Sequence, residues 1–328
     1  SKVVNLGIKR IHGNIIVETE GEPASIPGSW PWEDVANYYG ALYHSFNYRD
    51  NTYTINLKSG KSGTQTKVVS VVPSVPGVKL RNEVMASAKN GNDAWIYGGP
   101  EAATLLIQGT NPANRSSFAV KGAIHHPDAC FRAELEKRLK GKGITLDKQK
   151  IEDGERHALL TTVSPFLKDI VYYTNKNSIN LFAEALGELI SPTDYARTVK
   201  AELSGMGIDS CGITLKDASG LSPANAVPAE VFTDLLIWAK GHLSDVFVAS
   251  LPQGNVDWGL RIYSDHPILR GNILAKTGSM SGVRALAGYL KTQRGETLAF
   301  TILVNNYVGD PVKVQEIIRD LLKEFADK

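Results

Sequence analysis

NILAKTGSMSGVRALAGYLKTQRGETLAFTILV, residues 272–304, contains three segments in which apolar residues alternate with other residues or follow one another. Turns made of glycine or polar residues separate the segments. The segments are residues 272–276, 283–289 and 297–304. Short apolar segments joined by turns are typical of an antiparallel meander. A helix-start signal, Asp310-Pro311, follows them, and apolar residues then recur on one helical face: Val314, Ile317, Ile318, Leu321 and Phe325. We therefore predict a three-stranded antiparallel sheet and a closing helix.

Upstream of this sheet, capping signals and apolar spacing predict four helices. Ser164-Pro165 and Ser191-Pro192 each combine an N-cap residue with proline at the first helical position, and Pro228 starts another helix. A further helix should begin near Ser178, with an apolar face made by Leu181, Phe182, Ala185, Leu186 and Leu189. Helices followed by an antiparallel sheet and a closing helix indicate an α+β domain.

The first part of the chain has a different pattern and is predicted to be rich in β-strands. Gly, Pro, Asn and Ser separate short strand-like segments at residues 3–8, 13–18, 52–57, 66–72 and 94–97. One helix is predicted from Pro127-Asp128 to Gly141. The polar stretch LDKQKIEDGERH then favours a boundary, which divides the chain into residues 1–155 and 156–328.

The composition fits an ordinary globular protein and excludes several classes of protein. The 328 residues are 42% hydrophobic and 21% charged, a length for which two domains are the default expectation. The net charge of +2 gives no basic footprint for nucleic acid. Because no apolar run approaches the ~20 residues of a membrane span, we expect no transmembrane segment. No signal peptide is visible at the first residues, and the sequence does not indicate an oligomeric state.

Lys276-Thr277-Gly278 is the first candidate for chemistry, since it ends the first strand of the predicted sheet. The Lys276 ammonium would supply a positive field, and the Thr277 hydroxyl could donate to a substrate carboxylate. Gly278 would let a substrate backbone lie against the strand, and the Ser279 amide could serve as an oxyanion donor. An isolated K-T-G tripeptide is more often the end of a surface strand.

Ser178-Ile179-Asn180 lies well before K-T-G in the chain and is the second candidate. The Ser178 hydroxyl could relay protons and the Asn180 amide could orient a substrate peptide group. The alternative is that Ser178 is an N-cap and Asn180 a surface residue. Asp217, at the start of D-A-S-G-L-S, is a candidate to line the same cleft from a tight loop, although a plain turn would have the same pattern.

Other combinations of chemical side chains do not form a convincing site. His125-His126 lacks a further ligand pair, so we expect no metal. No spacing supports a Ser-His-Asp set, and no glycine-rich phosphate loop follows a strand, so no cofactor is expected. Cys130 and Cys211 are too few for a disulfide scaffold; they could pair in an oxidising compartment or remain buried free thiols.

Together these stretches resemble the penicillin-binding protein 4 type of D-alanyl-D-alanine carboxypeptidase and endopeptidase, peptidase family S13. The resemblance is carried, in order, by IHGNII, GSWPWEDVANYY, NKNSINLFAEA, DASGLS and AKTGSMSGVRALAG. It covers essentially the whole chain and is most like the Bacteroidetes branch. Two positions depart from the family pattern, because Ile179 stands where Asp is usual and Ala218 where Gly is usual.

The resemblance implies a penicillin-recognising transpeptidase-like domain with β-rich accessory domains inserted before its second part. Residues 1–155 would be the accessory region and residues 156–328 the C-terminal part of the transpeptidase-like domain. It implies Ser178, Asn180 and Lys276 as catalytic residues, with Thr277, Gly278, Ser279 and Asp217 binding substrate. It further implies a periplasmic protein whose partners are peptidoglycan stem peptides and β-lactams.

The family's S-x-x-K nucleophile motif is absent, because no serine in the sequence has lysine three positions later. Our main hypothesis is a serine D-Ala-D-Ala carboxypeptidase or endopeptidase whose nucleophile-bearing segment is absent from this chain. The alternatives are a non-catalytic relative that binds muropeptides, and a structural cell-wall module.

Overall fold

A computed structural model describes residues 2–19, 25–148, 156–243, 245–263 and 265–328. The chain forms two compact units, Ser1–Ser164 (unit 1) and Pro165–Lys328 (unit 2). The boundary predicted after residue 155 falls at the end of residues 149–155, which lie outside the described part of the chain.

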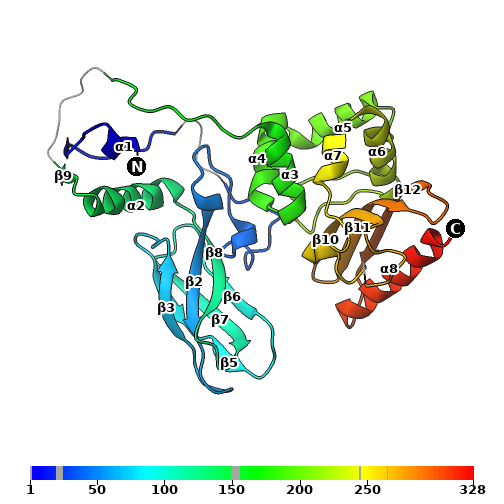
Figure 1. Ribbon diagram of the computed structural model, residues 1–328, viewed down its shortest axis with the longest axis horizontal. Coiled ribbons are helices and arrows are strands. Elements are labelled where there is room, and N and C mark those ends of the chain that lie inside the picture. Colours follow the sequence, from blue (N-terminus) through cyan, green and yellow to red (C-terminus); the bar gives the residue numbers. More distant parts are fainter. Residues whose placement is uncertain (1, 20–24, 149–155, 244, 264) are drawn as a thin grey trace. The chain divides into compact units, whose positions relative to one another are not determined.

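Unit 1 consists mainly of short strands (Figure 1), and their buried apolar side chains form a core. One antiparallel sheet has the order β3-β2-β8. In a second sheet, β7 pairs in parallel with β4 and β5 and antiparallel with β6. Ile55, Ile96 and Ile107 are fully buried between these strands. The elements are α1 (Lys2–Asn5), β1 (Arg10–His12), η1 (Tyr38–Gly40), η2 (Arg49–Asn51), β2 (Thr52–Lys58), β3 (Lys67–Val72), β4 (Lys79–Asn82), β5 (Met85–Ser87), β6 (Asp93–Tyr97), β7 (Thr104–Pro112), β8 (Phe118–Ala123), α2 (Pro127–Gly141) and β9 (Thr145–Asp147).

The structure confirms part of the prediction for this unit and corrects the rest. The strands predicted at 52–57, 66–72 and 94–97 are β2, β3 and β6, and the predicted helix is α2. The strand predicted at residues 3–8 is wrong, because α1 covers its first part, and the one predicted at 13–18 is wrong because residues 14–19 are irregular. The strand in this region is β1, and its partner β9 lies far along the chain and pairs with it in parallel.

Unit 2 has the predicted α+β organisation (Figure 1). The meander consists of β10 (Ile273–Met280), β11 (Val283–Lys291) and β12 (Thr297–Asn305), all antiparallel, in the order β10-β11-β12. The helices are α3 (Leu167–Asn177), α4 (Asn180–Ile190), α5 (Tyr195–Gly205), α6 (Ala229–His242), α7 (Asp245–Ser250), the short η3 (Trp258–Leu260) and α8 (Pro311–Ala326). Helix α8 begins at the predicted signal, where the Asp310 carboxylate accepts from the Val312 N–H.

Helices cover both faces of this sheet. Ala275 and Leu286 pack with Ile318 and Leu322 of α8 on one face. Leu274 and Tyr289 pack with Leu236 of α6 on the other face, together with residues of α7. Successive side chains of a strand point to opposite faces of the sheet. The Lys276 side chain therefore lies on the same face as Leu274, and the Thr277 side chain lies on the same face as Ala275. β10 is an edge strand of this three-stranded sheet.

Two predicted helix starts shift in the structure. Phe166, not Ser164, is the N-cap of α3. Asp194, not Ser191, caps α5, because its carboxylate accepts a hydrogen bond from the Arg197 N–H. Helix α4 begins at Asn180, near Ser178 as predicted.

Candidate active site

The structure brings together two of the predicted catalytic residues, Ser178 and Lys276. The Lys276 Nζ donates a hydrogen bond to the Ser178 Oγ over 2.6 Å, although 98 positions separate the two residues in the chain. A second hydrogen bond, of 2.7 Å, joins the same ammonium to the Thr277 carbonyl oxygen. The K-T-G strand and the S-x-N turn thus form one polar cluster.

Ser178 occupies an unusual backbone position between α3 and α4. It ends α3 in the left-handed conformation, with φ 52° and ψ 53°, and its N–H still donates to the Thr174 carbonyl. A non-glycine residue in this conformation costs roughly 1–2 kcal/mol. The alternative reading of Ser178 as an N-cap is therefore wrong, since this serine closes one helix and turns the chain toward the next. The turn directs its exposed hydroxyl to Lys276.

Burial changes the acidity of the Lys276 ammonium. Desolvation lowers the pKa of Lys276 from its ordinary 10.5 to about 8. The group therefore stays largely charged at neutral pH but exchanges its proton far more readily than a surface lysine. With a hydroxyl 2.6 Å away, this is an arrangement suited to proton relay and to holding a negative group.

The edge of β10 is paired in its first half and open in its second. The Ala275 N–H donates to the Pro252 carbonyl and the Gly254 N–H to the Ile273 carbonyl, both over 2.9 Å. Within the described residues, no backbone hydrogen bond continues this pairing along 276–280. An extended peptide could therefore add to the open half of the strand.

The other predicted residues surround this edge. Asn180 is the first residue of α4 and is half-buried, two positions after Ser178. Thr277 and Gly278 are half-buried on β10, and Ser279 is exposed. A Cβ added to Gly278 would lie 3.1 Å from the Ala285 Cβ of β11, so a side chain here would crowd the neighbouring strand.

Asp217 organises its own loop. Its carboxylate accepts hydrogen bonds from the Gly220 N–H at 2.9 Å, the Ser222 N–H at 2.6 Å and the Asn225 Nδ2 at 2.6 Å. The residue is buried, with 7% of its surface exposed. The carboxylate that was predicted to bind substrate thus has three donors from residues 217–225 around it.

Two contributions to this region were not predicted from the sequence. Glu184 of α4 accepts from the backbone N–H groups of Ala218 and Ser219, and burial is the main cause that raises its pKa. Lys176 of α3 donates to the Leu251 carbonyl over 2.7 Å and to the Asp257 carboxylate over 3.0 Å. A charged residue on the otherwise apolar face of α4 was the available signal for Glu184; no local signal linked Lys176 to Asp257.

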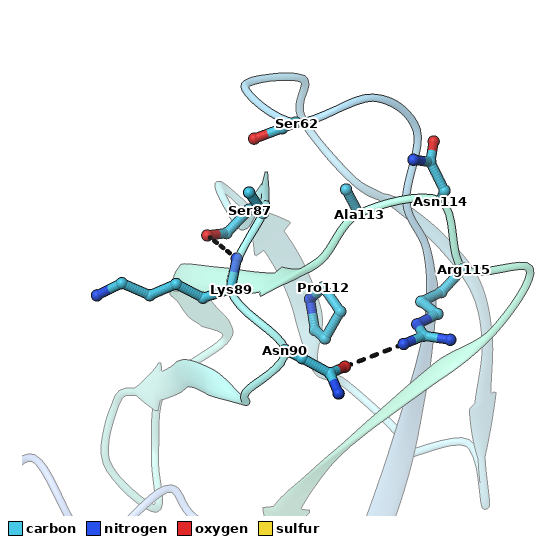
Figure 2. Close-up of a pocket in the computed structure, with 9 residues that line it drawn as sticks. Ser62, Ser87, Lys89, Asn90, Pro112, Ala113, Asn114 and Arg115 are labelled. Carbon is cyan, nitrogen blue, oxygen red and sulfur yellow. Dashed lines mark hydrogen bonds between the residues drawn. The ribbon is translucent and has the colours of Figure 1, made fainter.

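A separate cavity of about 270 Å³ lies in unit 1, at the loops that end β5 and β7 (Figure 2). Figure 2 shows the Arg115 guanidinium donating to the Asn90 side chain, with the Lys89 side chain extending away from the other lining residues. Its lining contains none of the predicted site residues and no acidic side chain. We therefore place the candidate active site at β10.

Among the residues that the structure describes, no group of three His, Cys, Asp or Glu side chains is arranged to hold a metal ion. No helix there combines the length and the apolar character needed to cross a bilayer. Cys130 is a buried free thiol and Cys211 an exposed one.

Comparison with known proteins gives a consistent family. The sequence model of the D-Ala-D-Ala carboxypeptidase 3 (S13) family matches residues 1–328. The D-alanyl-D-alanine carboxypeptidase of Actinomadura sp. strain R39 is 25% identical over 370 residues, covering 99% of this chain and 66% of the relative. The D-alanyl-D-alanine carboxypeptidase DacB of Haemophilus influenzae is 25% identical over 330 residues, covering 93% of this chain and 67% of the relative.

The fold agrees with a solved structure. The crystal structure of penicillin binding protein 4 from Haemophilus influenzae superposes with a TM-score of 0.78 at 23% identity, covering 100% of this chain and 78% of that one. This confirms the predicted fold class. The chain spans about two thirds of the length of the curated relatives it matches.

Proposed function

The chain belongs to the D-Ala-D-Ala carboxypeptidase 3 (S13) family, and we propose that it supplies one side of a serine-peptidase active site. The whole protein would act on peptidoglycan stem peptides as a D-Ala-D-Ala carboxypeptidase or endopeptidase. The observation that carries the proposal is the 2.6 Å hydrogen bond from the Lys276 ammonium to the Ser178 hydroxyl at the open edge of a strand. Family membership and this geometry support the same reaction class.

In the proposed reaction, substrate lies as an additional strand along the open half of β10. The Lys276 ammonium supplies a positive field in the cleft and exchanges protons through Ser178. The Thr277 hydroxyl donates to the substrate carboxylate, the Asn180 amide orients a peptide group, and the Ser279 N–H faces the developing oxyanion. Asp217 contributes by fixing the loop beside α4.

In this proposal the nucleophile belongs to a part of the protein outside these 328 residues, which contain no S-x-x-K motif. Its serine oxygen would attack the D-Ala carbonyl and form an ester, while the leaving amine takes the proton removed from the serine. Water would then hydrolyse the ester and regenerate the hydroxyl. β-Lactams would acylate the same serine, and the substrate places the protein outside the cytoplasm, in the periplasm.

The proposal is tested by intact-mass spectrometry before and after exposure to a fluorescent penicillin. The 328-residue chain should carry no adduct, and a protein extended by the sequence that its gene encodes before Ser1 should carry one. In the extended protein, Lys276→Ala should slow acylation by about 10²–10³-fold, the size of effect seen when one charge-stabilising donor is lost. Lys313→Ala, at an exposed lysine of α8, is the matched control and should leave the rate unchanged.

Two results would contradict the proposal. Labelling of the 328-residue chain itself would mean that another serine is the nucleophile. An unchanged acylation rate in Lys276→Ala would remove Lys276 from the site.

A second candidate function, muropeptide binding without acylation, is supported by the absent S-x-x-K motif. An extended protein that binds muropeptides at the β10 edge but forms no adduct would favour this candidate.

A further inference from the structure

In the loop at residues 253–258, beside the candidate site, a charged side chain points inward and two apolar side chains point to solvent. Asp257 points inward to Lys176, and these two side chains are only 23% and 13% exposed. Its neighbours Val256 and Trp258 are 71% and 88% exposed. Soluble proteins usually bury the apolar residues and solvate the charged one. Two exposed apolar side chains on either side of a half-buried, paired carboxylate indicate a surface that contacts an apolar group.

The loop is firmly held in this arrangement. The Asp257 carboxylate accepts from Lys176 Nζ at 3.0 Å and from the Gln253 N–H at 2.7 Å. The Val256 and Asp257 N–H groups both donate to the Gln253 carbonyl. One residue earlier on α3, the Asn175 amide donates to the Ser250 Oγ over 2.7 Å. Exposure of Trp258 is thus a property of an ordered loop.

The loop also lies directly against the open edge. Residues 252–254 pair with β10 up to Ala275. After the loop, η3 packs on β10, and a Cβ added to Gly259 would lie 3.5 Å from the Thr277 Oγ1. Trp258 precedes Gly259 in η3, and the Gly259 backbone lies near the Thr277 hydroxyl, on the sheet face opposite to that of Lys276. The two faces of the edge thus carry different chemistry.

We propose that Trp258 and Val256 form an apolar subsite for the leaving residue of the substrate, the residue on the carboxyl side of the cleaved bond. This inference rests on the proposed function, in which Thr277 holds the carboxylate of that residue. The subsite would favour leaving residues with an aliphatic chain over alanine, as a cross-linked diamino acid presents. Lys176 and Asp257 act as positioning residues for the indole.

The test uses the 328-residue chain labelled with 5-fluorotryptophan, whose five tryptophans give separate fluorine signals. The Trp258 signal is identified with Trp258→Phe. The probes are acetyl-D-Ala-D-Ala and acetyl-D-Ala-D-norleucine. We expect both to shift the Trp258 signal, and the norleucine peptide to bind about three- to tenfold more tightly, as expected for aliphatic carbons that are partly buried. Trp238, which stacks on His242 in the same unit, is the internal control and should not shift.

Variants separate this inference from a structural effect. Trp258→Ala should abolish the preference for norleucine while binding of acetyl-D-Ala-D-Ala changes less than twofold. Asp257→Asn should weaken the preference without abolishing binding, because the indole loses its fixed position. Both variants must keep the Trp238 signal of the folded chain.

Each remaining outcome is decisive. If Lys276→Ala weakens binding of both peptides but Trp258→Ala leaves the preference intact, this inference fails and the proposed function stands. If neither peptide binds to the 328-residue chain, this inference fails, and the proposed function is decided by the acylation experiment on the extended protein. If the Trp258 signal moves with protein concentration alone, the surface joins two copies of the chain and the inference is overturned.

Discussion

The loop at residues 217–225 and the Ser178–Lys276 pair belong to the same unit, and both withdraw polar groups from solvent. In the loop, one buried carboxylate accepts from three donors, and Glu184 accepts from two more N–H groups. In the pair, a desolvated ammonium faces a hydroxyl held on left-handed backbone. The loop is built as hydrogen-bonded structure. The pair combines a strained backbone at Ser178 with a desolvated ammonium at Lys276. Both features lower stability, and such features are common at functional sites. Substitutions in the two regions should therefore change stability in opposite directions.

The largest effect is expected in the loop. Asp217→Ala removes the acceptor of three hydrogen bonds, so the free energy of unfolding of unit 2 should fall by about 3 kcal/mol. Asp217→Asn keeps one acceptor oxygen and should lose less. Urea unfolding, followed by the fluorine signal of Trp238, measures both. A loss below about 0.5 kcal/mol, the scale of ordinary surface substitutions, would mean that solvent replaces these bonds and that the contrast with the pair is wrong.

The next effect should have the opposite sign. Lys276→Met removes a buried ammonium whose pKa lies at about 8 in the folded chain, below the ordinary 10.5. The folded state binds fewer protons between these pH values, so the cost of burying the charge is complete below pH 8 and disappears above pH 10.5. We expect the variant to be about 1–2 kcal/mol more stable at pH 7, after allowing for its lost hydrogen bonds.

The same urea experiment, repeated at several pH values, checks this prediction. The advantage of Lys276→Met should shrink as pH rises from 8 to 10.5. A variant less stable than the parent at pH 7 would show that the lysine is well paired, like Asp217, and would remove the difference between the regions.

The smallest effect is expected at Ser178, where two substitutions distinguish the strain of the backbone from the role of the hydroxyl. Ser178→Gly relieves a left-handed backbone and should stabilise unit 2 by about 0.5–1 kcal/mol, whereas Ser178→Ala should be nearly neutral. Both lose the hydroxyl, so both should slow acylation of the extended protein. Equal stability of the glycine and alanine variants would mean that the turn carries no strain.

The sequence predicted unit 2 well because its signals are local. Apolar segments, turns and the Asp310-Pro311 cap occur in consecutive residues, and β10, β11, β12 and α8 follow them in the same order. The pairing of β1 with β9 could not be read in this way, since a parallel partner far along the chain leaves no local pattern. Strand β7 was missed for another reason. It contains Gly109, and glycine in a sequence usually indicates a turn. Here the glycine is needed inside a strand, because a Cβ would lie 2.0 Å from the Asp93 carbonyl oxygen.

The candidate site was predictable where residue type alone carries the chemistry. K-T-G and S-x-N identified Lys276 and Ser178, and the structure adds the contact between them. The roles of Asn180, Thr277, Gly278 and Ser279 stay predictions. The Lys176–Asp257 pair could not be predicted, because neither residue belongs to a motif and only the folded chain brings them together. The origin of the chain in the Bacteroidetes branch likewise stays a prediction.

The separation of 98 residues between Ser178 and Lys276 also has a kinetic consequence. The strands of the meander are neighbours in sequence, so their contacts close short loops and should form early in folding. The contact between Ser178 and Lys276 closes a long loop and should form late. We therefore expect Lys276 to acquire its lowered pKa only when the corner between α3 and α4 packs against the sheet.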